Sequence, residues 1–357
     1  MTDKPHIAGT KPRLVHLEKR KKPYLWCSCG KSATQPFCDG AHIGTDFRPV
    51  KIAEGDTGGE ALLCMCKQTR TPPYCDGAHN ALSDKYEEAD ADEQAAAAGI
   101  RPTGFDQGDH GTALLDGGCF VRRLGPDDYQ NQNGWRISPC IGDDTGAKFL
   151  SHFMLAADAA GVGALTFGTS GAALFVHAGA GRIAIGGRAM SIAPETGFYV
   201  APGESFWIEQ MESGPLSLSG VVCPLIDGPQ AGDTTSTYFD ERIAKRLAVV
   251  DEDQRETMAD RFYQVLVGEE TGPVGITQFI GEIPKSRAAA HRHLYEETIT
   301  ILSGEGLMWT ENACAPVRPG DVIFLPRKQL HSLECTSEAG MRLMGAFYPS
   351  GSPAINY

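Results

Sequence analysis

The sequence predicts a mainly β protein that is divided into two or three domains. At 357 residues the chain exceeds the usual size of one small domain. It contains 42 Gly and 22 Pro, a content typical of an architecture with many turns between short strands. Hydrophobic residues make up 41% of the chain and charged residues 22%, as in soluble globular proteins that bury sizeable cores.

The first 86 residues contain a repeated pattern of cysteine and histidine. One copy reads Cys27-Ser-Cys29, then Ser32, Pro36 and Cys38-Asp39-Gly40-Ala41-His42, and the other copy repeats these spacings from Cys64 to His79. The two copies are 37 residues apart, since 64 minus 27 is 37. A duplication that preserves every position is not expected by chance.

Three thiolates and one imidazole within sixteen residues form a compact set of metal ligands. The Asp39-Gly40 pair predicts a tight turn that returns His42 to the side of Cys38. Three Cys and one His also suit structural zinc, so zinc is the alternative occupant. The Cys-x-Cys spacing is tighter than the Cys-x₂-Cys spacing of zinc knuckles, which is an argument against zinc.

These motifs resemble the CDGSH iron–sulfur family, with Ala41 and Ala78 at the family's Ser position, over roughly residues 10–85. The resemblance implies two [2Fe–2S] clusters, each with one iron bound by a Cys pair and the other by one Cys and one His. The implied ligands are Cys27, Cys29, Cys38 and His42 for the first cluster and Cys64, Cys66, Cys75 and His79 for the second. Family members with a single motif form homodimers, so residues 1–86 are expected to pack as a pseudo-dimer within one chain.

Residues 87–108 mark a domain boundary. The stretch EEADADEQAAAAG is acidic and Ala-rich, and predicts a linker or a short surface helix that ends at Gly99 and Pro102. The following residues have strand-like ends around a centre rich in Asn and Gly, and we expect them to supply the first strands of a barrel over 109–228.

A second set of metal ligands lies in the C-terminal part, residues 229–357. His291 and His293 are two residues apart, Glu297 follows, and Gly304 lies seven residues further on. Residues two apart on a strand face the same side of a sheet, so both imidazoles can face one cavity. Together with His331, they form a first shell for a divalent transition metal that keeps positions open for substrate or oxygen.

These residues resemble the two motifs of the cupin superfamily, small antiparallel β-barrels with a double-stranded β-helix fold. The second motif is met by Pro319-Gly320-Asp321, Pro326 and His331, with Lys328 where the family usually has Gly. The resemblance implies that the metal ligands are His291, His293, Glu297 and His331. Glu296 is the rival carboxylate, but it is one residue off the spacing and is expected to face the other way. The expected metal is Fe(II), with Mn, Ni and Zn as alternatives.

Residues 146–228 repeat the short strands and Gly turns without the ligands. Aligning Gly179 with Gly304 places Thr166, Gly168 and Ala172 where His291, His293 and Glu297 lie, and a count of five from Pro202 places Trp207 at the position of His331. The sequence therefore predicts a metal-free cupin barrel over 109–228 and a metal-binding one over 229–357.

The polar segment that enters the second barrel predicts a helix around residues 240–247 and then a β-hairpin around residues 269–272. Arg287 is expected to bind a carboxylate group of the substrate. Gln278, Trp309 and Tyr348 are further candidates to line the cavity, although ordinary core or rim positions suit them equally well.

The combination of motifs indicates an oxidoreductase. Two one-electron centres and one open metal site in a single chain match the logic of an oxygenase whose clusters feed electrons to a mononuclear non-haem iron. The expected partners are a small-molecule substrate, O₂ and an external reductase or ferredoxin-type donor, because no nucleotide-binding Gly-rich fingerprint is present. The alternatives are a cupin dioxygenase, isomerase or lyase with redox-sensing clusters, and a non-enzymatic iron or redox sensor.

The composition of the chain indicates where the protein is located and which classes of partner are not expected. The net charge of −13 argues against nucleic acid as the main partner. The N-terminus has no apolar run typical of a signal peptide and no stretch reaches transmembrane length, so we expect a cytoplasmic protein that does not bind membranes. Many cupins are dimers, and a homodimer is expected here too.

Overall fold

The computed structural model describes residues 4–18, 22–52, 60–69, 71–75, 78–82, 93–94, 97–158, 161–258, 261–272 and 274–354. The chain divides into a small unit of residues 1–86 with 352–357, and a larger unit of residues 87–351. Most of the acidic stretch and the second Asp-Gly turn lie outside the described residues. Within the described ranges, none of the helices has both the length and the apolar character needed to cross a membrane.

The small unit is held together by two short antiparallel pairs of strands. β1 (Arg13–His16) pairs with β4 (Glu60–Leu63), and β2 (Leu25–Trp26) pairs with β3 (Val50–Lys51). A 3₁₀ helix, η1, covers Ala78–Leu82. The first pair joins a strand that precedes the first cysteine motif to the strand that enters the second motif, so the two motifs share one core.

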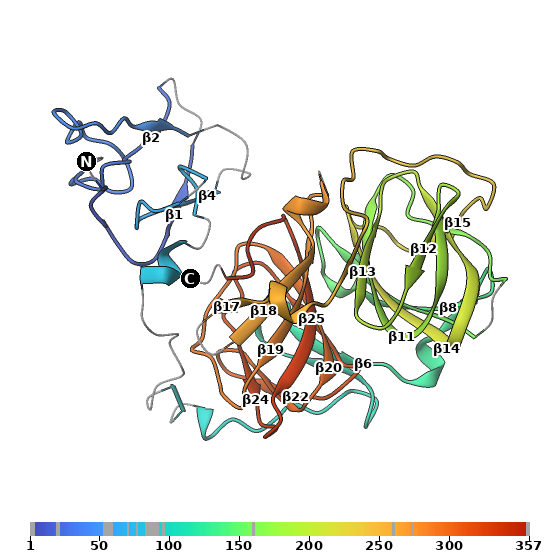
Figure 1. Ribbon diagram of the computed structural model, residues 1–357. Coiled ribbons are helices and arrows are strands. Elements are labelled where there is room, and N and C mark those ends of the chain that lie inside the picture. The colour runs from blue at the N-terminus through green and yellow to red at the C-terminus, as the bar shows by residue number, and fades with distance from the viewer. Residues whose placement is uncertain are drawn as a thin grey trace. The chain divides into compact units, whose positions relative to one another are not determined.

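The larger unit contains two β-barrels, which confirms the mainly β prediction (Figure 1). The strands of the first barrel are β7 (Gln130–Gln132), β8 (Trp135–Ile141), β9 (Ser151–Ala157), β10 (Leu165–Thr166), β11 (Gly171–Ile185), β12 (Arg188–Ile192), β13 (Thr196–Val200), β14 (Ser205–Cys223), β15 (Gln230–Ala231) and β16 (Leu247–Val249). The short 3₁₀ turn η3 (Pro126–Asp128) precedes β7, and η4 (Asp143–Thr145) connects β8 to β9.

The second barrel has two facing sheets. The strands of one are β5 (Gly111–Leu114), β6 (Phe120–Arg123), β17 (Glu256–Met258), β18 (Arg261–Val267), β19 (Thr277–Ile283), β20 (Glu296–Ser303), β23 (Val322–Leu325) and β25 (Met341–Tyr348). The strands of the other are β21 (Gly306–Trp309), β22 (Cys314–Val317) and β24 (Ser332–Cys335). The 3₁₀ turns η2 (Asp116–Gly118), η5 (Glu252–Gln254) and η6 (Glu269–Thr271) complete it, and the expected hairpin around residues 269–272 is formed by β18 and β19.

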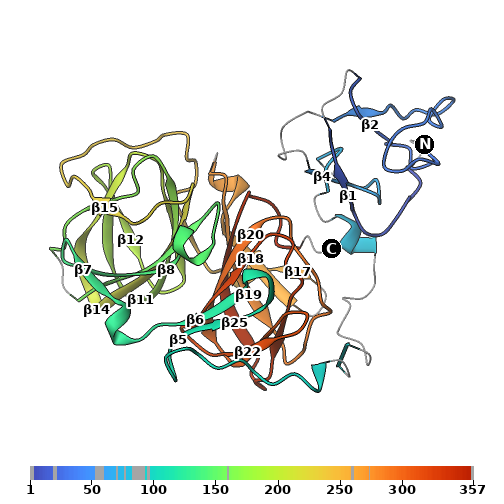
Figure 2. The same ribbon diagram turned by 180° about the vertical axis from the view of Figure 1, so that it is seen from behind.

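Each barrel takes strands from the other half of the chain. β5 and β6 lie within residues 109–228 but belong to a sheet of the second barrel (Figure 2), in which β5 pairs with β6 and β6 pairs with β23. Conversely, β16 lies within residues 229–357 and pairs with β13 of the first barrel. The two predicted ranges therefore do not account for this exchange, and the expectation that all of residues 109–145 lead into the first barrel is wrong for β5 and β6.

Buried ion pairs fix both exchanged segments. Arg123 of β6 donates two hydrogen bonds to the Asp321 carboxylate, at 2.8 and 2.7 Å. Arg246, beside β16, donates two bonds of 2.6 Å to Glu204 of the first barrel. Bidentate pairs of this kind combine strength with a defined geometry. Their partners are far apart in sequence, which is why the local pattern of a strand did not reveal its sheet.

The binding of Arg246 and Asp240 also explains a second difference. Residues 240–247 form turns and no helix, contrary to the expectation from sequence. The Asp240 backbone N–H donates to Glu204, and the Asp240 carboxylate accepts bonds from the side chain and backbone of Arg242. These contacts hold the segment against the first barrel in an irregular conformation.

The two barrels share one backbone framework at an offset of 125 residues. Ala172 lies opposite Val200 and Val222, and Glu297 lies opposite Leu325 and Phe347, each number being 125 higher. Gly179 and Gly304 both have left-handed φ angles, 82° and 81°, and at each a Cβ atom would collide with the backbone of the neighbouring strand.

This framework corrects one sequence alignment. Gly203 (φ 80°) and Lys328 (φ 68°) are equivalent left-handed residues, and each donates its N–H to the equivalent carbonyl, that of Gly168 or His293. Three residues later come Phe206 and His331 respectively. Phe206 therefore occupies the position of His331, and the expectation of Trp207 there is wrong by one residue because the count began at Pro202.

Candidate metal centres

In the small unit, the eight predicted cluster ligands come together in four pairs. The Sγ atoms of Cys27 and Cys29 are 3.6 Å apart, and those of Cys64 and Cys66 are 3.4 Å apart. The two mixed pairs bring Sγ and Nδ1 to 3.1 Å and 3.3 Å; they are Cys38 with His42 and Cys75 with His79. Two ligands about 2.3 Å from one tetrahedral metal lie about 3.8 Å apart, so each pair fits one iron.

The pairs differ in their access to solvent. The four cysteines of the Cys–Cys pairs are each about 1% exposed, whereas Cys38, Cys75 and His42 are partly exposed. The first Cys–His pair is set by the predicted turn: the Asp39 carboxylate accepts bonds from the backbone N–H groups of Ala33 and Ala41, and Gly40 is left-handed. The chemistry of the donors and their pairing fit [2Fe–2S] clusters with the Cys–His iron on the outer side.

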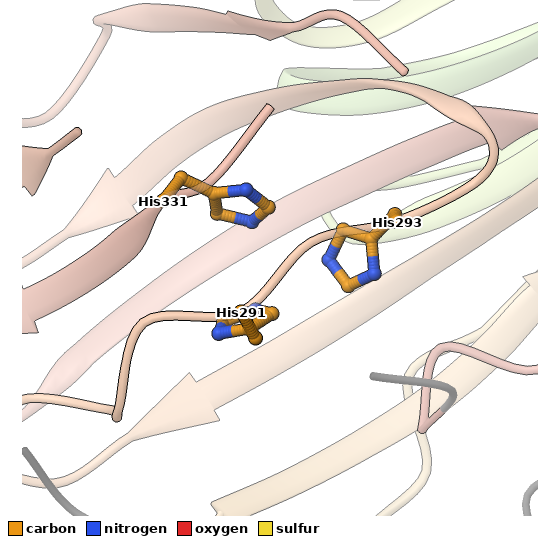
Figure 3. A group of neighbouring side chains, drawn as sticks. All are labelled: His291, His293 and His331. Carbon is orange, nitrogen blue, oxygen red and sulfur yellow. The ribbon is translucent and has the colours of Figure 1, made fainter. Parts of the chain in front are cut away.

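In the second barrel, His291, His293 and His331 form a compact group (Figure 3). One ring nitrogen from each lies within 4.8 Å of the others, and the rings face a common space. His291 and His331 meet through a β-bridge, in which the backbone N–H of each donates to the carbonyl of the other at 2.9 Å. The predicted triad is thus assembled from a segment before β20 and a residue before β24.

Hydrogen bonds orient two of these imidazoles toward a metal. His291 Nδ1 lies 2.9 Å from the Ala289 carbonyl oxygen, and His331 Nδ1 lies 2.9 Å from that of Gln329. A carbonyl only accepts, so Nδ1 must carry the proton and Nε2 keeps its lone pair for a metal. Burial lowers the pKa of His291 to about 4 and that of His331 to about 3, which keeps both rings neutral near pH 7.

The two neighbouring carboxylates have different roles. Glu297 is buried, with Oε2 3.5 Å from His293 Nε2, and burial raises its pKa to about 8. A divalent cation would reverse that shift, so Glu297 suits a fourth ligand beside His293. Glu296 faces the other way, as expected: its carboxylate accepts backbone N–H bonds from Lys148, Phe149 and Leu150 at 2.9 to 3.3 Å.

Two further residues near the triad were missed by sequence reasoning. Tyr295 stacks on His293 with ring centres 4.4 Å apart and on Phe347 at 4.0 Å, which fixes the plane of the His293 ring. Arg261 is 8% exposed, and after burial its positive charge is a further cause that lowers the pKa of His291. The position of Tyr295, two residues after His293, was a signal in the sequence that could have identified this residue. No such signal pointed to Arg261.

Several predicted cavity residues lie elsewhere. The guanidinium of Arg287 stacks over the Trp309 ring at 4.2 Å, and Trp309 packs with Ala97 and Cys314 in a separate cluster under residues 97–100. This placement argues against the expected carboxylate-binding role of Arg287. Tyr348 stacks on Phe149, and Gln278 approaches Gly197, so both face the first barrel instead of the triad.

The equivalent interior of the first barrel is apolar. Ala172 and Phe206, at the positions of Glu297 and His331, are fully buried among Trp135, Phe167 and Phe198. Among the described residues, the one group of three or more potential ligands within 4.8 Å is the triad of the second barrel.

Comparison with protein families matches both ends of the chain. Residues 4–43 match the iron-binding zinc finger of CDGSH type, and residues 281–347 match the cupin domain. The chain thus carries a CDGSH segment, which implies an iron–sulfur cluster, and a cupin domain, which implies a metal.

The curated relatives resemble the N-terminal part. The mitochondrial CDGSH iron-sulfur domain-containing protein 3 of Mus musculus is 43% identical over 56 residues, 15% of this chain and 40% of that protein. An uncharacterized protein of Methanocaldococcus jannaschii is 33% identical over 79 residues, 21% of this chain and 63% of its own length. The chain therefore spans less than two thirds of either relative.

Solved structures resemble the larger unit. Procruciferin, an 11S globulin from Brassica napus, superposes with a TM-score of 0.52 at 11% identity, over 65% of this chain and 85% of its own. A mutant of oxalate decarboxylase from Bacillus subtilis gives 0.51 at 12% identity, over 68% of this chain and 79% of its own. At these identities the likeness is one of fold, and its extent is greater than either barrel alone.

Proposed function

We propose that the protein is an oxidoreductase in which two CDGSH-type [2Fe–2S] clusters supply electrons to a mononuclear non-haem iron in the C-terminal barrel, for the oxygen-dependent oxidation of a small molecule. The observation that carries the proposal is that one chain brings together four close pairs of Cys and His side chains in the small unit and three histidines in the second barrel. When bound, the clusters would supply single electrons and the iron would activate oxygen.

The residues of the barrel perform the remaining tasks. His291 and His331 present Nε2 with the proton held on Nδ1, and the Tyr295 ring keeps His293 in a fixed plane. His293 and His331 are buried and His291 is partly buried, which would limit the access of bulk water to the reacting groups. In this proposal Arg261, a buried cation whose charge acts on His291, would orient a substrate that carries a negative charge.

The electron donor in this proposal is an external reductase or ferredoxin-type protein. The partly exposed Cys–His pairs suit electron entry, because the Cys–Cys pairs are buried. We further propose a homodimer, in which the clusters of one protomer can serve the barrel of its partner.

Metal content tests the two kinds of site together. Protein purified without oxygen should contain about four iron and four acid-labile sulfide from two clusters, and about one further iron from the barrel. His291→Ala should remove about one iron and no sulfide. The matched control is Thr166→Ala, the equivalent position in the first barrel, which should leave iron and sulfide unchanged.

Electron flow is tested by reducing the clusters without oxygen and mixing them with oxygenated buffer and substrate candidates. In wild type and Thr166→Ala the visible bands of the oxidised clusters should return faster than in His291→Ala. Equal rates in all three proteins would contradict electron supply to the barrel. Loss of manganese, nickel or zinc from His291→Ala, with iron at about four, would favour a cupin dioxygenase, isomerase or lyase, or a sensor, with redox-sensing clusters.

A further inference from the structure

Lys67 is a buried lysine that follows Cys66 in the second cysteine motif. Its side chain lies in the core of the small unit, with 6% of the residue exposed. The ammonium Nζ lies 4.6 Å from the centre of the Trp26 ring and donates a 3.0 Å hydrogen bond to the Cys64 carbonyl. Trp26 Nε1 donates to the same carbonyl at 2.8 Å. Since Trp26 precedes Cys27, the ammonium joins the start of the first motif to the start of the second.

The ammonium of Lys67 lies beside both Cys–Cys pairs, because it donates to the carbonyl of Cys64 and lies over the ring of Trp26, the neighbour of Cys27. Burial lowers the pKa of Lys67, and the negative charges of the two pairs oppose that shift, in the order Cys27, Cys64, Cys66 and Cys29. Lysine is almost never fully buried unless negative charge compensates the loss of its hydration. Two bound clusters, each held by thiolates, provide that compensation.

The duplication is asymmetric at this position. Since 67 minus 37 is 30, the equivalent residue of the first motif is Gly30, and both residues have left-handed φ angles, 64° for Lys67 and 75° for Gly30. A Cβ atom at Gly30 would collide with the His6 carbonyl, so the first motif has no room for a side chain there. A left-handed conformation is unfavourable for lysine. The second motif therefore keeps a side chain at a backbone cost, and its cation serves both motifs.

We propose that Lys67 is a shared electrostatic partner of the two iron–sulfur clusters and raises the reduction potential of each. Reduction would transfer one electron from a one-electron donor to a cluster and add one negative charge near the Lys67 side chain. A cation in a poorly solvated core stabilises the more negative state. The inference rests on the binding of both clusters and is independent of where their electrons go afterwards.

The test separates the effect of the Lys67 charge on the reduction potentials from the effect of the side chain's shape. Lys67→Gln removes the charge but keeps a donor for the Cys64 carbonyl, and Lys67→Arg keeps the charge. The control is Lys31→Gln, two residues after Cys29, where the lysine is exposed. Potentials of both clusters are titrated without oxygen by visible absorbance and electron paramagnetic resonance, after iron and sulfide have been counted.

In Lys67→Gln, the ratio of reduced to oxidised cluster at a fixed potential should fall about tenfold for each cluster, equivalent to about 59 mV for one electron. In Lys67→Arg and Lys31→Gln both ratios should stay within about twofold of wild type. A change in Lys67→Gln below twofold at either cluster would overturn the shared role.

Loss of clusters is equally decisive. Loss of iron and sulfide from Lys67→Gln, with both retained in Lys67→Arg, would show that the charge is required to hold the clusters and would support the proposal. Loss from both variants would show that the packing of the lysine matters and its charge does not, which would overturn it. If one cluster remains, its potential decides by the same twofold limit.

Discussion

The two barrels of the larger unit share their strand register and their left-handed turn residues but differ in what fills the interior. In the C-terminal barrel the equivalent positions hold Glu297 and His331, and in the N-terminal barrel they hold Ala172 and Phe206. The backbone framework thus does not depend on a metal. Where ligands are absent, an aromatic cluster occupies their space, so the same position holds a buried aromatic ring in one barrel and a potential metal ligand in the other.

Truncating this equivalent position in each barrel should give opposite results. Phe206→Ala removes a fully buried ring from the first barrel and should lower the free energy of unfolding by about 3–5 kcal/mol without changing metal content. His331→Ala should remove about one metal ion per chain and change the stability of the metal-free protein by roughly 1 kcal/mol or less. The measurements are denaturant unfolding and metal analysis of both variants.

The outcome can break the comparison in two ways. A small stability change in Phe206→Ala would mean that the aromatic cluster is not the support of the first barrel. Retained metal in His331→Ala would mean that His331 is not part of the ligand set, and Phe206 would then not mark a lost ligand.

The contact between the barrels adds a pH dependence that belongs to neither interior. His152 of β9 is fully buried, and its Nδ1 lies 2.8 Å from Thr298 Oγ1 of the other barrel. Burial lowers the pKa of His152 to about 3, below its ordinary value of 6.5. Because the folded pKa is the lower one, this residue stabilises the fold fully above pH 6.5 and its contribution is lost as the pH falls toward 3.

When the pH falls from 7 to 4.5, the titration of His152 should therefore lower the free energy of unfolding by about 2–3 kcal/mol. His152→Gln cannot take up this proton, so its unfolding free energy should fall less over the same range. His177, His291 and His331 titrate in both proteins, so the difference between the curves reports His152 together with its electrostatic interaction with His177. Parallel curves for wild type and variant, measured by urea unfolding at several pH values, would count against the assignment.

The features predicted correctly from the sequence are those that depend on the spacing of residues within a short segment. The ligand pairs of the small unit and the triad of the second barrel lie within short segments or at the ends of neighbouring strands, so motif spacing located them. The opposite faces of Glu296 and Glu297 also followed from strand alternation.

The features that depend on contacts between residues far apart in the sequence were not predicted. The exchange of β6 is fixed by Arg123 with Asp321, and that of β16 by Arg246 with Glu204; neither partner can be read from the strand itself. Arg287 was the residue expected to bind a carboxylate, but it stacks over Trp309. Arg261 lies on β18, an earlier strand whose register the local pattern did not fix, and its charge acts on His291.

Those two arginines provide the last and smallest test of the difference between the barrels, because an anion bound at the metal centre of the second barrel would interact with a nearby cation. With metal bound, Arg261→Met should weaken the binding of a small carboxylate such as acetate about tenfold, since one charge-assisted interaction is lost. Arg287→Met should leave that affinity within about twofold, because Arg287 stacks on Trp309 outside the triad. Isothermal calorimetry on both variants measures this, after metal content has been matched to wild type. A larger loss in Arg287→Met than in Arg261→Met would restore the assignment made from the sequence and place the anionic group of the ligand on the other side of the triad.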